Sequence, residues 1–565
     1  MPDELLLGNR FNFLRHMIQL EAIGQVMVLV GRGVCIGVGP ATRGPALMPY
    51  GIIGSQASLI KKTYYAGPLC DGLITAANQG CSVVMGVRVL GPNYATAGLD
   101  LNDSRISPVK IGRFDATGPG AWGQIPRIKI DNGDMNGIKT EIFNGNGGTD
   151  PYALMFDDLI GETSTIDRIK LAGSVLPIVY TGDPDPGEAK IDTHGFLYFG
   201  TWPDDTQEIE IKYAYHSRKI IFQDEDSLPD EFNNIMDLTK LQAVLRDYSI
   251  ATFTPVYGAT HLPARTLVNQ EVAWVTMTGG LDGETITYAD WQKAFDSIID
   301  NLDETIYPST IFTTAHGDAP GVFNVVPQMD AFLRKSANGK GATKKKPMQG
   351  FISLVDPGET ILTDQLMADF AGGYDNLWMT LIANGLDENE LNLAAARAGQ
   401  EAALALAVSP AATSSNALKG IMGLLFQINP VDRETFTYGQ IEVLIKHTGV
   451  YPYVGISTDP NDSFKRTVDV RTICECIVIV DNVVEKYLNE KRTLTNLAMM
   501  RNAIYAILDQ MKSQSILDTF DITVTPNLAD HNAVDITLKI QPVGHIERVY
   551  TWMGVGYYNP SAVAA

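Results

Sequence analysis

VMVLVGRGVCIGVGPATRGPALMP, the stretch at residues 26–49, predicts β structure that glycines interrupt and prolines end. A helix is expected at residues 71–78, and CSVVMGVRVL at residues 81–90 predicts a further strand. Alternation of β and α segments is typical of a wound α/β body, which places the first part of such a body at residues 24–105.

The next segment has a different hydrophobic pattern. In EIEIKYAY, residues 208–215, apolar side chains alternate with other residues, and turn residues separate similar runs upstream. Period-two alternation predicts strands with one face in solvent. We therefore expect an inserted all-β domain, sandwich- or barrel-like, at residues 106–232, followed by the second part of the α/β body at residues 233–454.

Two helices are predicted in that second part. Trp291, Phe295, Ile298 and Leu302 recur at helical spacing, and an Ala-rich stretch should form a helix that stops before Pro410.

Residues 455–557 predict a compact α+β domain, with residues 1–23 as an N-terminal arm and residues 558–565 as a short tail. One helix carries an apolar face made of Leu497, Met500, Ile504, Ile507, Leu508 and Met511. Three strands are expected after it, in FDITVT, NAVDITLKIQPV and HIERVYTWMGVGY. Upstream, RTICECIVIV should be extended and bury Cys474 and Cys476 on one face.

Composition excludes several classes of function. The chain has 565 residues and a net charge of −22, which argues against nucleic acid as its main partner. The sequence contains no apolar stretch of about 20 residues, so no membrane span is predicted. The first residues lack the features of a secretory signal. Five cysteines, few and odd in number, favour synthesis in a reducing cytoplasm.

No catalytic, cofactor or metal site is predicted. The glycines of GRGVCIG have the wrong spacing for a dinucleotide loop, and no helix is expected to begin there. The eight histidines are scattered, and C-E-C is too short for a zinc pair. A site assembled only in space remains open.

Several short motifs follow one another along the chain. Gly39, Gly44 and Pro45 form a G-x-x-x-x-G-P turn, and the segment from Asn78 and Gly80 leads to a strand that ends in V-R-V at residues 87–89. Further motifs are ATGPGAWG (116–123), MTGGLDG (277–283), V-D-V-R (468–471) and I-E-R-V-Y (546–550). In order and spacing they resemble the contractile phage tail sheath proteins.

The resemblance implies a structural subunit and not an enzyme, without a cofactor. Such subunits polymerise as stacked hexameric rings around a tail tube and contract to drive the tube through the host envelope. The implied partners are further copies, the tail tube protein, and baseplate and tail terminator proteins, with no direct contact with nucleic acid or membrane. The implied location is the virion tail, and the host cytoplasm during assembly.

The resemblance also implies surfaces of contact. Arms of neighbouring copies would complete the sheet of the C-terminal domain by strand exchange, with candidate residues Leu5, Leu6, Leu7, Phe11, Phe13, Ile546, Val549, Tyr550 and Trp552. That domain would face the tube and the inserted domain would face outward. Candidates for tube contact are Arg492, Arg501 and Lys512.

Two other functions remain open. The chain could form the sheath of a related bacterial contractile injection or secretion system, and neighbouring capsid genes would then be absent. It could also be a multidomain α/β enzyme with an unrecognised active site, which predicts a deep pocket with perturbed titratable groups and a small, discrete oligomer.

Overall fold

The computed structural model describes residues 33–105, 107–156, 158–161, 165–192, 194–225, 227–246, 248–303, 305–315, 325–338, 345–354, 374–406, 408–411, 416–460, 466–488, 490–528 and 533–544. The chain divides into two compact units. One comprises Met1–Cys35, Thr75–Val83 and Asp303–Ala565, and the other Ile36–Ile74 and Val84–Leu302. Within the described ranges, no helix is long and apolar enough to cross a bilayer.

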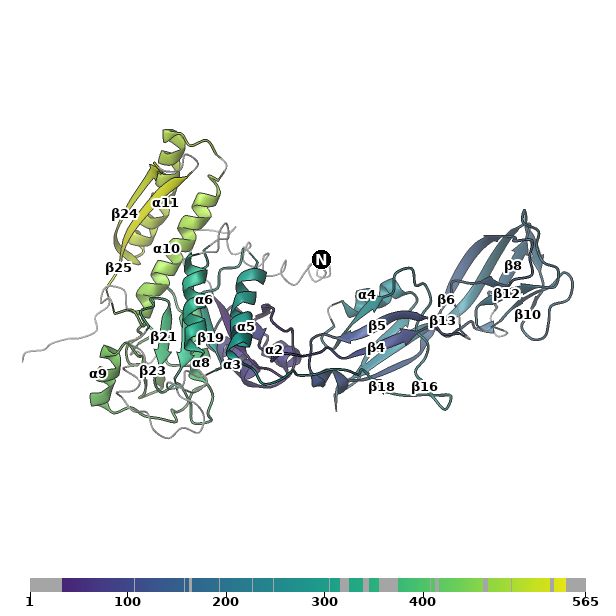
Figure 1. Cartoon of the computed structure of the whole chain (residues 1–565), viewed down its shortest axis with the longest axis horizontal. Coiled ribbons are helices and arrows are strands. Elements are labelled where there is room, and N and C mark those ends of the chain that lie inside the picture. The colour runs from purple at the N-terminus through teal and green to yellow at the C-terminus, as the bar shows by residue number, and fades with distance from the viewer. Residues whose placement is uncertain are drawn as a thin grey trace, which may run out of the picture. The chain divides into compact units, whose positions relative to one another are not determined.

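The first unit contains a parallel sheet of β19 (Thr310–Thr313), β20 (Gln349–Ser353) and β21 (Met379–Ile382). Every residue of these strands is buried, as parallel strands covered on both faces require. Helices α6 (Val326–Asn338) and α8 (Leu393–Ala403) pack against the sheet (Figure 1). A mixed α/β architecture is therefore confirmed.

Helix α8 is the predicted Ala-rich helix. Asn392 caps its start by accepting a hydrogen bond from the Ala394 amide, and the helix ends at Ala403, short of Pro410. All residues from 393 to 402 are buried. A Cβ on Gly399 would lie 2.6 Å from the Ala76 carbonyl oxygen. Small residues in α8 therefore permit close packing on several sides at once.

Four charged side chains of the first unit are buried together. Arg397 donates to Glu442 at 2.6 and 3.1 Å and to Glu401 at 3.0 Å, and Arg471 lies 3.0 Å from Glu401. Burial raises the pKa of Glu442, and the Arg397 guanidinium opposes that rise. This buried quartet joins α8 to α10 (Thr467–Glu485), on which Arg471 lies.

The prediction of an extended segment at residues 471–480 is wrong, because these residues lie within helix α10. Cys474 and Cys476 are both buried, as expected, but residues two apart on a helix point in different directions. Valine and isoleucine favour strands only weakly, and packing overrides that preference when a helix is covered on several sides.

Beyond α10 lies a small α+β arrangement. Helix α11 (Leu494–Ser513) packs against the antiparallel pair β24 (Leu517–Pro526) and β25 (Val534–Pro542), with α10 alongside (Figure 1). The predicted apolar face of α11 is buried, apart from the half-buried Ile507. The remaining elements among the described residues of the first unit are α9 (Pro430–Tyr438), β22 (Leu444–Lys446) and β23 (Val450–Pro452).

The second unit begins with a wound segment. Strands β2, β3 and β1 lie in that order, and α5 buries Trp291, Phe295 and Ile298 as predicted. The bounds are β1 (Val34–Gly39), β2 (Tyr50–Ile53), α2 (Ala57–Tyr64), α3 (Pro68–Asn78), β3 (Val83–Arg88) and α5 (Tyr288–Asn301).

The rest of this unit is mostly β structure. Two long strands, β6 (Arg127–Asn144) and β13 (Glu208–Gln223), pair antiparallel along their whole length and form a ribbon (Figure 1). The other elements are β4 (Gly98–Asn102), β5 (Lys110–Ala116), η1 (Ala121–Gln124), β7 (Tyr152–Ala153), β8 (Arg168–Leu171), β9 (Ser174–Leu176), β10 (Ile178–Val179), β11 (Ala189–Ile191), β12 (Phe196–Phe199), β14 (Asp230–Ile235), α4 (Leu238–Leu245), β15 (Ala251–Pro255), β16 (Leu267–Val268), β17 (Glu271–Val272) and β18 (Val275–Thr276).

The alternation predicted for β13 holds only in its first half. Ile209, Ile211 and Tyr213 are buried and their neighbours are more exposed, whereas most residues after Tyr213 are buried on both faces. One apolar core runs through the β structure of this unit. No sheet in the described residues closes into a barrel. The predicted domain boundaries at residues 106 and 232 stay a prediction.

The buried quartet predicts a large effect of a single substitution. Arg397→Met removes the cation between two buried carboxylates, and we expect it to lower the free energy of unfolding by about 3–5 kcal/mol. Arg334→Met is the control, because Arg334 pairs with Asp330 on the surface and should contribute at most about 1 kcal/mol. Urea unfolding measures both, and equal losses would contradict the assignment.

Candidate functional site

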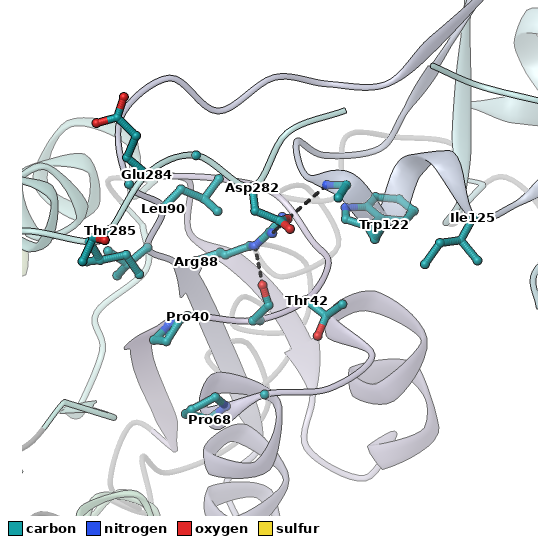
Figure 2. A pocket seen from close by; sticks show the side chains of 17 residues that line it. Pro40, Thr42, Pro68, Arg88, Leu90, Trp122, Ile125, Asp282, Glu284 and Thr285 are labelled. Carbon is teal, nitrogen blue, oxygen red and sulfur yellow. Dashed lines mark hydrogen bonds and ion pairs between the residues drawn. The ribbon is translucent and has the colours of Figure 1, made fainter. Parts of the chain in front are cut away.

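Arg88, at the end of β3, binds backbone carbonyls in two loops of the second unit. Its side chain is only 1% exposed. Its Nε donates to the Ala41 carbonyl at 2.7 Å, and its Nη1 donates to the carbonyls of Pro119 at 2.6 Å and Gly44 at 3.3 Å. Figure 2 shows the guanidinium between the loop that carries Pro40 and Thr42 and the side chain of Asp282. Three of the motifs quoted above therefore meet at one side chain.

A fourth motif reaches the same place through Asp282. One of its carboxylate oxygens lies 3.8 Å from Arg88 Nη2 and accepts a hydrogen bond from the Ala121 amide at 3.1 Å. Next to it, Trp122 Nε1 donates to the Pro119 carbonyl at 3.0 Å. Because Asp282 is 63% exposed, it closes the cluster from the solvent side. We call Arg88, Pro119, Trp122 and Asp282 the arginine cluster.

Glycine is required at the centre of the arginine cluster. Gly120 has φ 127°, a conformation that residues with a Cβ rarely adopt. A Cβ there would also lie 2.7 Å from the Asp282 carboxylate and 3.1 Å from Arg88 Nη2. Glycine at position 120, in the motif ATGPGAWG, is therefore explained by close packing around a guanidinium.

The charge of Arg88 survives its burial. Loss of water lowers the pKa of Arg88 to about 10, and the Asp282 carboxylate opposes that change. The guanidinium therefore stays protonated at neutral pH. Its N–H groups satisfy the carbonyls of Ala41, Gly44 and Pro119, and the Pro119 carbonyl also accepts from Trp122.

An open pocket of about 740 Å³ lies beside the arginine cluster (Figure 2). Its wall is largely apolar, from Pro40, Pro68, Leu90, Trp122 and Ile125, with carboxylates from Asp282 and Glu284. These lining residues include no Ser, Cys, His or Lys that could serve as a nucleophile or base. In the described ranges, no group of His, Cys, Asp or Glu side chains is arranged to hold a metal ion.

The three predicted tube-contact residues lie in the first unit and are exposed. Arg501 and Lys512 are eleven residues apart on α11, which puts them on the same side of the helix. Arg492 precedes the helix and donates to the carbonyls of Asn527 and Ala533, at 3.2 and 3.3 Å. Arg501 donates to the Ile522 carbonyl at 3.2 Å. Both guanidinium groups, those of Arg492 and Arg501, therefore also hold the β24–β25 hairpin.

The strand-exchange candidates fall outside the described residues, at both ends of the chain. Strand β25, which precedes the C-terminal candidates in the sequence, is described. Among the described residues, β25 pairs only with β24, so its other edge has no partner strand there. Ile536, Leu538 and Ile540 point toward the apolar core of α10 and α11 but are only half-buried. The core of this α+β arrangement is open along β25.

Sequence reasoning missed several residues that organise the two units. Arg88, Asp282 and Arg471 stood inside quoted motifs, but nothing in the motifs showed what they would bind. Glu442 gave no signal, because it meets Arg397 only after folding, whereas Arg397 and Glu401 have the i, i+4 spacing that a helix brings together.

The arginine cluster predicts a stability effect that depends on shape as well as charge. Arg88→Met removes a donor from the Ala41 and Gly44 carbonyls and one of the two donors of the Pro119 carbonyl, and we expect it to lower the free energy of unfolding by about 3–5 kcal/mol. Arg88→Lys keeps the charge but lacks the planar fork, and should recover only part of that loss. The control, Arg113→Met, alters a half-exposed ion pair with Asp115 and should change it by at most about 1 kcal/mol. Full rescue by lysine in urea unfolding would contradict this account.

No family model and no curated protein sequence match this chain. Solved structures do. A sheath tail protein from Listeria innocua aligns with 95% of this chain and 97% of its own, at a TM-score of 0.57 and 12% identity. A sheath tail protein from Desulfitobacterium hafniense aligns with 94% of this chain and 97% of its own, at a TM-score of 0.50 and 12% identity. Over nearly its whole length, this chain has the fold of the sheath tail proteins.

Proposed function

We propose that this chain is the structural subunit of a contractile phage tail sheath, and not an enzyme. One observation carries the proposal: the alignment with a sheath tail protein covers 95% of this chain and 97% of that protein. Such coverage includes the β structure of the second unit as well as the α/β sheet. A shared α/β sheet alone would fit many functions.

The open edge of β25 supports self-assembly. An unpaired strand edge beside a half-covered apolar core gains hydrogen bonds and buried area when a strand is added. In the proposal, that strand comes from the arm of a neighbouring copy, through Leu5, Leu6, Leu7, Phe11 and Phe13. The closing segment with Ile546, Val549, Tyr550 and Trp552 takes part in the same proposed strand exchange.

Assembly in the proposal produces stacked hexameric rings around a tail tube. Contacts that repeat from copy to copy without closing generate such stacks and helices. Contraction is then a switch between two packings of the same blocks, with the arms keeping the copies joined. The buried quartet is suited to this role, because it holds α10 against α8 while the packing changes.

The proposal gives each part of the chain a direction and a partner. Residues 455–557 face the tube, and Arg492, Arg501 and Lys512 contact it. The inserted β domain at residues 106–232 faces outward, on the α/β body of residues 24–105 and 233–454. Baseplate and tail terminator proteins bind the two ends of the sheath in the virion tail. Assembly takes place in the host cytoplasm, with no direct contact with nucleic acid or membrane.

Purified chain alone should form tubes or stacked rings. We expect the contracted packing, because no tube is present to template the extended one. Negative-stain electron microscopy at high protein concentration measures this. A monodisperse monomer or dimer would contradict the proposal and would favour the enzyme alternative.

The linking role of the arm is tested separately. Deletion of residues 1–20 should leave a subunit that unfolds as the full chain does but forms no long polymers. Replacement of the same residues by a Gly/Ser stretch of equal length should have the same effect, because the contact needs apolar side chains. Electron microscopy and urea unfolding give the two readouts. Long polymers from either variant would show that another surface links the copies.

A further inference from the structure

Two strained residues face each other in the second unit. Tyr65, just after α2, has φ 63° and ψ −71°, and Glu225, just after β13, has φ 46°. Residues with a Cβ rarely adopt positive φ, and Asn and Asp tolerate it best. Tyr65 and Glu225 are neither of these. The Tyr65 hydroxyl donates to the Glu225 carboxylate at 2.6 Å. Backbone strain is thus present on both sides of one hydrogen bond.

The strain at Tyr65 has a visible cause. The Ala66 amide donates to the Tyr64 carbonyl at 2.9 Å, which closes a γ-turn of the rare, strained kind around Tyr65. The Thr42 amide donates to the Ala66 carbonyl at 2.9 Å, so the turn is held from its other side. These bonds direct the tyrosine ring toward the end of β13.

A second contact lies beside the first. Arg43 is 5% exposed and binds Asp224 through both carboxylate oxygens, with the Nη2–Oδ1 distance at 2.7 Å. Its guanidinium carbon lies 4.3 Å from the centre of the Tyr65 ring and 5.1 Å from that of Trp122. Stacking and ion pairing therefore hold one arginine between the two sides.

The two contacts meet at the base of the β6–β13 ribbon. Gln223, the last residue of β13, pairs with Arg127, the first residue of β6. Asp224 and Glu225 follow at once, in a turn closed by the bond from the Ser227 amide to the Asp224 carbonyl at 2.9 Å. The contacts of Arg43 and Tyr65 with this turn therefore also hold the ribbon at its base.

We propose that Arg43, Tyr65, Asp224 and Glu225 form a strained latch, which holds the base of the ribbon on the α2–α3 connection and releases backbone strain when it opens. Strained backbone persists only where surrounding contacts impose it. A latch with strain on both sides favours two discrete arrangements of the ribbon. The link to contraction rests on the proposed function, in which neighbouring copies supply the force that opens the latch.

Hydrogen exchange on the full chain tests the latch itself. Tyr65→Phe removes only the hydroxyl, so the amides of Thr42, Ala66 and Ser227 should exchange about tenfold faster or more. Tyr257→Phe is the control, because Tyr257 is fully exposed, and should leave these amides unchanged. Unchanged exchange in Tyr65→Phe would overturn the latch. This readout needs no polymer, so a chain that forms no tubes would contradict the proposed function and leave this result standing.

A second variant tests where the strain comes from. In the Tyr65→Phe background the hydrogen bond to Glu225 is lost, so residue 225 should be free to leave positive φ. Glu225→Gly should then give no gain in thermal stability. A clear rise in the melting temperature of the double variant, relative to Tyr65→Phe alone, would show that the turn imposes the strain by itself. That outcome would overturn the strained latch.

Discussion

The buried guanidinium of Arg88 is the interaction on which the second unit depends. A carbonyl that is turned away from water needs a donor, and Arg88 supplies one to Ala41, Gly44 and Pro119. Its charge faces Asp282, and glycine at position 120 leaves room for both. Loops that are far apart in the sequence are thereby joined at the end of one strand. A group with a single donor could not replace a planar fork in this role.

The first unit is organised by the same chemistry with different partners. Its buried arginines, Arg397 and Arg471, are paired with carboxylates, and every charge of this quartet is inside the protein. Removing one partner from such a group is costly, so the group resists rearrangement. Helix α10 is held by the quartet near its start and contributes Cys476, Ile479 and Val483 to the apolar core with α11. One continuous helix therefore couples the α/β sheet to the C-terminal hairpin.

In the proposed function, rigid groups and open edges have complementary roles. The arginine cluster and the quartet keep the subunit intact, and the half-covered core along β25 offers a place for another chain. The latch at the base of the β6–β13 ribbon differs from both, because its contacts hold the backbone in unfavourable conformations. A subunit of this kind keeps its interior fixed and leaves its adjustable contacts at the surface and at the base of the ribbon.

The sequence by itself determined the helices and strands that have one buried face and one face in solvent. Helices α5 and α11 and the first half of β13 show a clear period, because one face of each is buried and the other meets solvent. The order of the motifs also pointed to the fold that the solved structures share. Only the tertiary structure decided α10, which is covered on several sides and whose run of Val and Ile residues also suits a strand. It alone decided the partners of Arg88 and Arg43 and the pairing of Arg397 with Glu442, because the pairing of groups distant in the chain depends on how the backbone is folded, which no local pattern encodes.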